Sequence, residues 1–405
     1  MTTTAERFPG ETQYRPNHHL SKHPEIGTGP VPIAPLTSPE YFERERERLF
    51  RRTWLNVGRA EQIPNAGDFF TIDLAVARTS LLIVRAKDGS LKAFHNVCQH
   101  RGNRLVWDKA GHCKGALSCG YHGWTYDTSG KLLYVPDEEN FWELDKAKHS
   151  LAQVAVDTWK GFVFVNLSPE SAPPLLDYLG PVAEELKNYP FEQFTYGVRY
   201  LVEVAANWKI CATSQEEGYH LPYVHKQSHG RAIPHDPDGN FRSIEIELLG
   251  DHSRITTGPH PDFRPSRMEA VTMRYLSGFV DAFSQDSSGN DEHAHTFDYY
   301  SIFPNFHMLV LNGNYLRYNF WPISEDRTLW EITAFYPEPQ NAGELLAIEY
   351  GKCAGRDIVQ EDVPMHEAIQ SSLRAGAITS FNFHDEETAA RQTMHVVDRY
   401  VNEPQ

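Results

Sequence analysis

The chain has 405 residues, 40% hydrophobic and 23% charged, a composition typical of a globular protein with more than one core. Its net charge of −16 argues against a nucleic-acid partner, because phosphate binding needs a basic surface. No apolar run reaches the roughly 18 residues that a membrane span needs, and the N-terminus lacks a secretory signal pattern. Since the five cysteines are sparse and odd in number, we expect a reducing compartment, the cytoplasm.

The N-terminal part of the chain consists of two segments that differ in composition. Residues 1–37 are rich in Pro, His and Gly, and we expect them to form a surface arm. Residues 38–53 carry the signals of a helix that docks on a core. Ser38 suits the N-cap and Pro39 suits the first helical position.

Residues 54–168 alternate short β-like runs with turn residues, which predicts an all-β domain. The dipeptide Asp88-Gly89 is a hairpin signal between two of these runs. The predicted strands run from Phe69 to Ile72, Ser80 to Arg85, Leu91 to His95, Leu132 to Val135 and Phe162 to Asn166.

Residues 169–405 have the mixed texture of an α+β domain. The segment FHMLVLNGNYLRYNFW places an Asn312-Gly313 turn between two aromatic-rich runs, and residues 330–336 add a third. This pattern predicts an antiparallel meander. Helical patterns flank it at about residues 207–225, 340–375 and 386–402.

A first constellation of metal-ligand types lies in the all-β region, where Cys98 and His100 are followed by Cys119 and His122. Two Cys and two His suit a zinc ion, or a 2Fe–2S cluster with two thiolates on one iron and two imidazoles on the other. A Cys2His2 zinc finger groups its cysteines in one knuckle and its histidines on one helix. Here each loop carries one of each, which favours the cluster.

A second constellation lies in NWKICATSQEEGYHLPYVH. Glu217 and His220 are three residues apart and would share one face of a helix. His220 and His225 are five apart, so they converge only if the helix breaks, and Pro222 supplies a reason for a break between them. Two converging His with a distant carboxylate would form the facial triad of a non-heme Fe(II) site. By itself this spacing is a weak signal.

The stretch NVCQHRG…LSCGYHGWTYD resembles the Rieske signature of the α subunits of Rieske non-heme iron oxygenases. The preceding run SPEYFERERERLFRRTWLNVGRAEQIPNAGDFFTIDL is also similar to that family. The resemblance implies a β-rich Rieske domain followed by a helix-grip-like α+β catalytic domain with an antiparallel sheet. It also implies that His220 and His225 bind a mononuclear iron, with Asp362 of QEDVPMHEAIQ as the third ligand.

The resemblance further assigns Glu217 as a bridge from iron ligand His220 to cluster ligand His122 of a neighbouring subunit in a homotrimer. Glu216 is the alternative bridge if the register shifts by one. Many family members have Asp at this position. The resemblance implies that electrons come from a separate reductase or ferredoxin, and some relatives add a β subunit. The substrate expected is small and aromatic or apolar cyclic, hydroxylated with O2.

The substrate pocket is expected on the C-terminal sheet, whose sequence alternates aromatic and polar residues. Three other interpretations remain open. The first is a Rieske monooxygenase or demethylase acting on an alkyl or quaternary ammonium group. The second is an electron-transfer protein with the cluster alone, and the third is a zinc-binding interaction module. The candidate pocket residues are Tyr299, Phe303, Asn305, Leu309 and Phe320.

Overall fold

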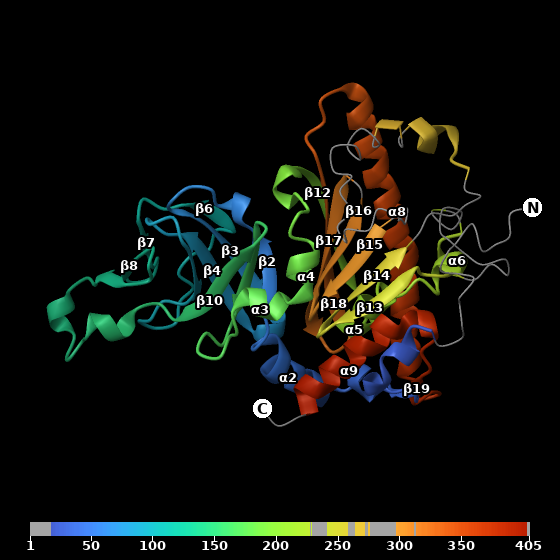
Figure 1. Cartoon of the computed structure of the whole chain (residues 1–405). Helices are drawn as coiled ribbons and strands as arrows, with labels where there is room; N and C mark the ends of the chain where they lie inside the picture. Colours follow the sequence, from blue (N-terminus) through green and yellow to red (C-terminus); the bar gives the residue numbers. More distant parts are fainter. Residues whose placement is uncertain are drawn as a thin grey trace, which may run out of the picture. The chain divides into compact units, whose positions relative to one another are not determined.

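The computed structural model divides the chain into two compact units. The β unit comprises Arg46–Tyr178, and the α+β unit comprises Met1–Glu45 together with Leu179–Gln405 (Figure 1). The chain therefore begins in the α+β unit, builds the β unit, and returns at Leu179. The residues that the structure describes are 18–226, 228, 241–257, 264–271, 274–275, 297–311 and 313–402.

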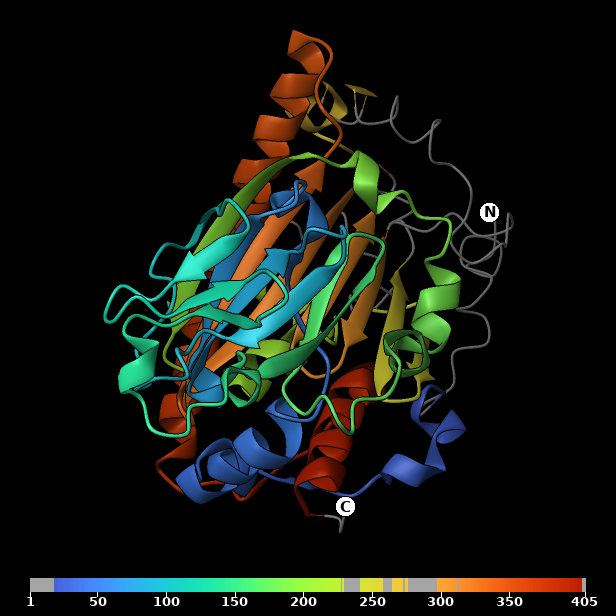
Figure 2. The same ribbon diagram turned by 90° about the vertical axis from the view of Figure 1, so that its left-hand side faces the viewer.

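The β unit contains a seven-stranded antiparallel sheet and a three-stranded sheet (Figure 2, blue to green). The buried core that these strands share includes Cys98 and Cys119. In order across the larger sheet, the strands are β2 Leu55–Arg59, β11 Phe162–Asn166, β10 Gln153–Trp159, β5 Leu91–His95, β4 Thr79–Arg85, β3 Asp68–Leu74 and β6 Ala110–His112. The smaller sheet holds β7 Ala116–Ser118, β8 Thr125–Asp127 and β9 Leu132–Tyr134.

All five strands predicted for this region are present, as β3, β4, β5, β9 and β11. The hairpin signal is also confirmed, because Gly89 has a φ of 83° in the turn between β4 and β5. Five further strands escaped prediction. Of these, β6, β7 and β8 have three residues each, which is too short for a visible alternation.

The α+β unit is organised around a seven-stranded antiparallel sheet, which confirms the predicted fold class. The meander is present as β16–β17–β18, and Gly313 adopts a φ of 94° in its first turn. Asn312 lies outside the described residues, as do residues 1–17 of the predicted arm. In order, the strands are β12 Tyr196–Val204, β18 Arg327–Tyr336, β17 Asn314–Ser324, β16 Phe306–Leu311, β15 Phe297–Ile302, β14 His252–Thr257 and β13 Glu245–Leu249.

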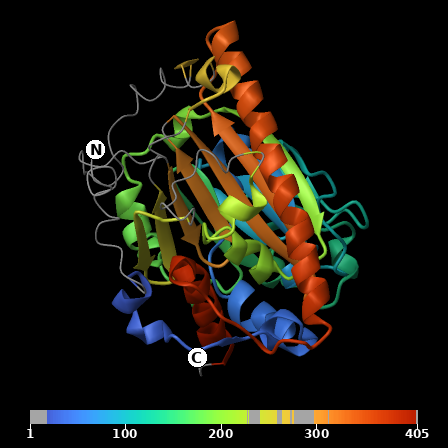
Figure 3. The same ribbon diagram turned by 90° about the vertical axis from the view of Figure 1, so that its right-hand side faces the viewer.

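Helices pack on one face of this sheet. The long helix α8 (Ala342–Leu373) contacts β12, α9 (Thr388–Asn402) contacts β13 and β14, and α5 (Trp208–Ser214) contacts β17 and β18 (Figure 3). Short helices α3 (Leu175–Leu179) and α4 (Pro181–Glu185) lead the chain back from the β unit. Near the N-terminus, β1 (Val31–Pro32) pairs with β19 (Ser380–Phe381).

Two predicted helices differ from the structure. The helix predicted at 38–53 is α-helical only over α2 (Pro39–Glu45) and continues as a π-helical turn, Arg46–Phe50. Its predicted start is correct, because Ser38 Oγ accepts the Tyr41 N–H at 3.1 Å. The helix predicted at 207–225 consists of α5 and the four-residue α6, Leu221–Val224.

The gap between α5 and α6 has a tertiary cause. Gly218 lies so close to the Phe241 ring that a Cβ atom would sit 2.2 Å from it, so the chain passes where no side chain fits. Adjacent Glu216 is fully buried and bonded to Ser301 and Thr393 of other elements. These long-range contacts override the local helical pattern.

Candidate metal centres

Two loops of the β unit have the same pattern of backbone hydrogen bonds. The N–H of Gly102 donates to the Cys98 carbonyl, and the N–H of Gly123 donates to the Cys119 carbonyl, each at 3.0 Å. Each cysteine N–H in turn donates to the carbonyl five residues further on, at 2.8 Å. Both glycines are left-handed, with φ values of 74° and 73°, a conformation that Gly adopts without a steric penalty. Each loop is therefore closed by its own sequence.

The four side chains predicted for the cluster meet where these loops face each other. Cys98 and Cys119 are buried, whereas His100 and His122 are partly exposed, and their Nδ1 atoms lie 3.1 Å apart. The Trp124 ring stacks on His100 with centroids 4.9 Å apart. Sulfur ligands in the interior and imidazole ligands toward the surface suit the two different irons of a Rieske cluster.

Tyr126 provides a test of whether these residues fit the cluster. Its hydroxyl oxygen accepts the Gln99 N–H at 3.0 Å and lies 3.4 Å from Cys98 Sγ. A thiolate that binds iron has no proton, so the hydroxyl must donate to the sulfur. Asn103 Nδ2 similarly lies 3.6 Å from Cys119 Sγ. Both sulfurs thus have a donor, which is the environment that stabilises a cluster thiolate.

The second ligand set converges in the α+β unit. One candidate ligand atom from each of His220, His225 and Asp362 lies within 4.8 Å of the others. The distances to Asp362 Oδ1 are 3.1 Å from His225 Nε2 and 3.7 Å from His220 Nε2. Two imidazoles and one carboxylate on one side of a centre form the facial arrangement of non-heme Fe(II) sites, which leaves positions open for O2.

Carboxylates orient both histidines. Glu217 lies 2.5 Å from His220 Nδ1, and Glu361 lies 2.8 Å from His225 Nδ1. A carboxylate at Nδ1 holds the proton there and leaves Nε2 with a free lone pair for a metal. Burial alone would lower the pKa of each histidine, but the nearby carboxylates raise it overall. The donor set and its negative surroundings therefore fit a divalent iron.

The local fold explains how histidines five residues apart converge. His220 stands directly before the single turn of α6 and His225 directly after it. Pro222 occupies an early position of that turn, where no backbone N–H is needed. The prediction that the helix breaks at Pro222, between the two histidines, is therefore wrong, since the chain leaves the helical path before His220.

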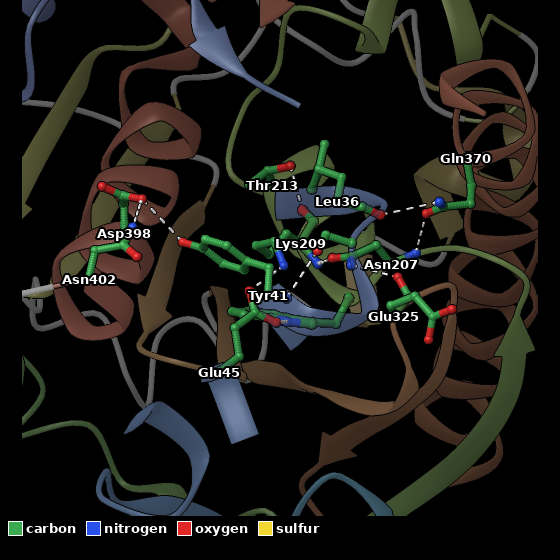
Figure 4. Close-up of polar contacts among 12 residues, drawn as sticks. Leu36, Tyr41, Glu45, Asn207, Lys209, Thr213, Glu325, Gln370, Asp398 and Asn402 are labelled. Carbon is green, nitrogen blue, oxygen red and sulfur yellow. Dashed lines mark hydrogen bonds and ion pairs between the residues drawn. The ribbon is translucent and has the colours of Figure 1, made fainter. Parts of the chain in front are cut away.

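A buried polar cluster fixes α5 beside the ligand helix α8 (Figure 4). The Asn207 N–H donates to Gln370 of α8 at 2.7 Å, and the Asn207 side chain caps α5 through the Lys209 N–H at 3.0 Å. The ammonium of Lys209 and the carboxylate of Glu45 form an ion pair, and both side chains are fully buried. The Trp208 indole N–H donates to the same carboxylate at 3.1 Å. This cluster places α5 before the chain turns toward His220.

The candidate pocket residues lie on or beside the sheet of this unit. Tyr299 and Leu309 are directly opposite each other on β15 and β16. Phe320 stacks on Trp330 at 5.4 Å, and Trp330 lies 5.8 Å from His366 of α8, which places this face toward the ligand helix. Phe303 and Asn305 belong to the β15–β16 turn, and both side-chain amide atoms of Asn305 are buried with no hydrogen-bond partner among the described residues.

The sequence interpretation missed three positioning residues. Glu361 stands next to Asp362 in the motif QEDVPMHEAIQ, and Tyr126 lies within the Rieske signature, but the sequence gives neither residue a role of its own. Gln215 donates to Asp362 Oδ2 at 3.1 Å. The signals were weak, because an acidic residue beside a ligand and a glutamine near a helix end are common on protein surfaces.

Comparison with known families agrees with both centres. Residues 53–158 match the Rieske [2Fe-2S] domain, and residues 191–403 match the family described as ring hydroxylating alpha subunit (catalytic domain). The second match covers more than half of the chain, so the chain belongs to the ring-hydroxylating α-subunit family of Rieske non-heme iron oxygenases. It thus carries a Rieske 2Fe–2S domain and a mononuclear iron site.

Curated relatives include oxygenase components of two kinds. The chain is 33% identical over 186 residues to a glycine betaine monooxygenase oxygenase subunit of Pseudomonas aeruginosa, covering 46% of this chain and 42% of that one. It is 36% identical over 198 residues to the large oxygenase component of a naphthalene 1,2-dioxygenase system of Pseudomonas aeruginosa, covering 47% and 43%. The matched segments thus span less than half the length of these relatives.

Solved structures of both kinds share the fold. A quaternary ammonium Rieske monooxygenase superposes with a TM-score of 0.76 at 21% identity, covering 96% of this chain and 99% of the other. Naphthalene 1,2-dioxygenase from Rhodococcus sp. gives a TM-score of 0.73 at 21% identity, with the same coverage. Among the helices that the structure describes, none is both long and apolar enough to cross a bilayer.

Proposed function

We propose that this chain is the terminal oxygenase of a multicomponent system that hydroxylates a small organic molecule with O2. The observation that carries the proposal is the convergence of His220, His225 and Asp362 in a chain that also has a Rieske domain. A Rieske cluster supplies single electrons, and a mononuclear iron with open positions supplies O2 activation when bound. Electrons would come from a separate reductase or ferredoxin.

The residues around the iron site would orient the ligands and pass on electrons. Glu217 holds His220 through Nδ1 and through the backbone N–H of His220, and its oxygens keep lone pairs that can accept a further hydrogen bond. We propose that this further bond comes from the partner subunit's His122 in a homotrimer. A β subunit, as in some relatives, is compatible with this arrangement.

We favour an aromatic or apolar cyclic substrate. The sheet face toward α8 presents large rings, including Tyr299, Phe320 and Trp330. Burial lowers the pKa of His307 on the same face to about 3, so this side chain is neutral at physiological pH. A neutral aromatic surface favours an apolar guest, because transfer of a flat ring from water is favourable.

A second candidate is monooxygenation of a quaternary ammonium substrate. Glycine betaine and carnitine monooxygenase subunits are 31–33% identical to matching segments of this chain. Tyr and Trp faces can also hold a cation through cation–π attraction. The proposed bridging residue is Glu217, where many family members have Asp. A Glu at this position is compatible with the second candidate.

The test begins with the metal content of the purified holoprotein. Iron and acid-labile sulfide, with EPR of the dithionite-reduced protein, should show a Rieske signal together with excess iron beyond the cluster. A cluster without further iron would support the pure electron carrier, and zinc without sulfide would support the interaction module. O2 uptake with bicyclic arenes and with trimethylammonium acids then separates the two substrate classes. Labelled O2 distinguishes insertion of one oxygen atom from insertion of two.

A further inference from the structure

A chain of buried polar groups crosses the interior of the α+β unit from Glu216 to Tyr299. Ser301 Oγ is hydrogen-bonded to Glu216 Oε1 and lies 3.1 Å from His307 Nε2. His307 Nδ1 lies 3.0 Å from the Tyr299 hydroxyl. Thr393 of α9 donates to the same Glu216 oxygen at 2.9 Å. Three successive polar contacts, through Ser301 and His307, therefore join the carboxyl group to the phenol.

The chemistry of each group allows this chain to carry a proton in one direction. When Glu216 is protonated, its O–H can donate to Ser301, the Ser301 O–H to His307 Nε2, and His307 Nδ1–H to the Tyr299 oxygen. When Glu216 is ionised, every one of these bonds reverses and points toward the carboxylate. A neutral imidazole offers one donor and one acceptor, as both states require. The same heavy-atom positions are thus compatible with both states of the chain, one with Glu216 protonated and one with Glu216 ionised.

Burial keeps this chain out of contact with bulk water. Glu216 and His307 are fully buried, and Glu216 Oε2 has no partner among the described residues. Burial raises the pKa of Glu216 to about 8 and lowers that of His307 to about 3. The titratable groups that face Glu216 are His307 of β16 and Tyr299 of β15. At neutral pH the carboxyl group therefore holds a proton and the imidazole does not.

The Tyr299 end of the chain lies on the sheet face that packs toward α8, the helix that carries Asp362, because its ring contacts lead through Tyr318 and Trp330 to His366. Burial raises the pKa of Tyr299 and of Tyr318, and Asp362 lies near enough to both phenols to raise each pKa further. The two phenol rings lie 6.0 Å apart. Tyr299 is 6% exposed, whereas Glu216 and His307 have no exposed surface. The phenol is therefore the most exposed member of the chain and the one whose pKa Asp362 affects.

We propose that Glu216, Ser301, His307 and Tyr299 form a proton relay that supplies protons to the O2-reducing site. The proposal rests on the proposed oxygenase function. Hydroxylation of R–H by O2 consumes two electrons and two protons and yields R–OH and water. The reductase supplies the electrons, and the relay delivers one proton per discharge while Glu216 becomes ionised. A proton that enters at Tyr299, the most exposed member, then returns along the reversed hydrogen bonds and restores the carboxylic acid. Glu216 and His307 act through Tyr299 and are positioning residues, not catalytic residues.

The first experiment needs no turnover. Infrared spectra of the holoprotein at pH 7 should show the carbonyl band of a protonated carboxylic acid, shifted in D2O and lost in E216Q. Glu386 is a matched control, because its carboxyl group is also buried and hydrogen-bonded to Ser243. Burial raises the pKa of this group as well, to about 7. The E386Q variant should keep the Glu216 band. If E216Q removes no carboxylic-acid band, Glu216 stores no proton and the relay is wrong.

The second experiment measures a single turnover of chemically reduced enzyme with O2. For E216Q we expect a roughly tenfold slower product step with unchanged dependence of its rate on substrate concentration, together with peroxide release and a larger solvent isotope effect. E216D should restore much of the rate, and E386Q should match wild type. Wild-type rate and coupling in E216Q would overturn the relay. A fully metallated wild type without any turnover would instead overturn the proposed function, whatever the infrared band shows.

Discussion

His225 Nδ1 is hydrogen-bonded to the carboxylate of Glu361 at 2.8 Å, while the next residue along α8 is the iron ligand Asp362. One helix thus supplies a ligand and the group that orients a second ligand. Ser228 donates to the same Glu361 carboxylate at 2.5 Å, which fixes its rotamer. The mononuclear site therefore depends on Glu361 although this side chain does not face the metal.

We predict that Glu361→Gln weakens iron binding by about 10–100-fold, the usual cost of removing a carboxylate behind a metal-binding histidine. The amide has no charge with which to hold the proton on Nδ1. Iron titration of the apoprotein would measure this change. Asp362→Ala is the control and should lose the mononuclear iron entirely while the Rieske absorbance survives. Unchanged iron affinity in E361Q would contradict the role of Glu361.

For Glu217 we expect a loss of turnover that persists even when the mononuclear site is fully loaded with iron. Glu217→Ala removes the carboxylate on His220 and the proposed link to the neighbouring cluster. Iron affinity should fall by about 10–100-fold, as for Glu361→Gln, so the variant is assayed in excess Fe(II), which the three intact ligands can still bind. Reduced cluster and substrate should then persist together in stopped-flow traces after O2 is added. Wild-type cluster reoxidation in this variant would show that electrons take another route.

The hydroxyl of Tyr126 should tune the cluster. Because it donates to Cys98 Sγ at 3.4 Å, it stabilises the more negative, reduced state. Tyr126→Phe is expected to lower the reduction potential by roughly 20–65 mV, the equivalent of one hydrogen bond of about 0.5–1.5 kcal/mol. Redox titration followed by circular dichroism would measure this shift. An unchanged potential would mean that the hydroxyl does not donate to the sulfur.

Removal of one partner from the buried ion pair of Lys209 and Glu45 should strongly destabilise the folded chain. Lys209→Met leaves the Glu45 carboxylate buried without its cation, which costs about 3–5 kcal/mol. Urea unfolding followed by tryptophan fluorescence would detect this loss. The exposed pair of Lys187 and Glu184 is the control, and Lys187→Met should cost no more than about 1 kcal/mol. Similar losses of unfolding free energy in the two variants would show that burial does not decide how much each ion pair contributes to stability.

The proton on Glu216 has a consequence for stability. Its pKa is raised from 4.5 to about 8 by burial, so between these pH values the folded chain holds a proton that the unfolded chain releases. The free energy of unfolding contributed by this group therefore falls as pH rises, by about 1.4 kcal/mol per pH unit. Gln has no such proton, so the stability of E216Q relative to wild type should rise with pH across this interval. A pH-independent difference between their unfolding free energies would exclude the raised pKa.

The sequence by itself determined the features that depend on neighbouring residues. The Rieske loops could be predicted because each closes through hydrogen bonds within five residues, with a glycine at the position that needs a positive φ. The strands β3, β4, β5 and β11 carry apolar runs bounded by turn residues. The helix that holds Asp362 shows a long helical pattern. These signals are local, whereas the assignment of His220, His225 and Asp362 as iron ligands rested on the resemblance to a known family.

Only the tertiary structure decided the features that depend on contacts between distant segments. The break after α5 comes from the packing of Gly218 on Phe241 and from the burial of Glu216. The pairing of Glu361 with His225 joins α8 to the segment after α6. The Glu216 carboxyl group, which would be ionised on the surface, holds a proton because burial raises its pKa more than the hydrogen bonds with Ser301 and Thr393 lower it. Burial and partner choice belong to the folded chain, because desolvation acts only where distant segments exclude water.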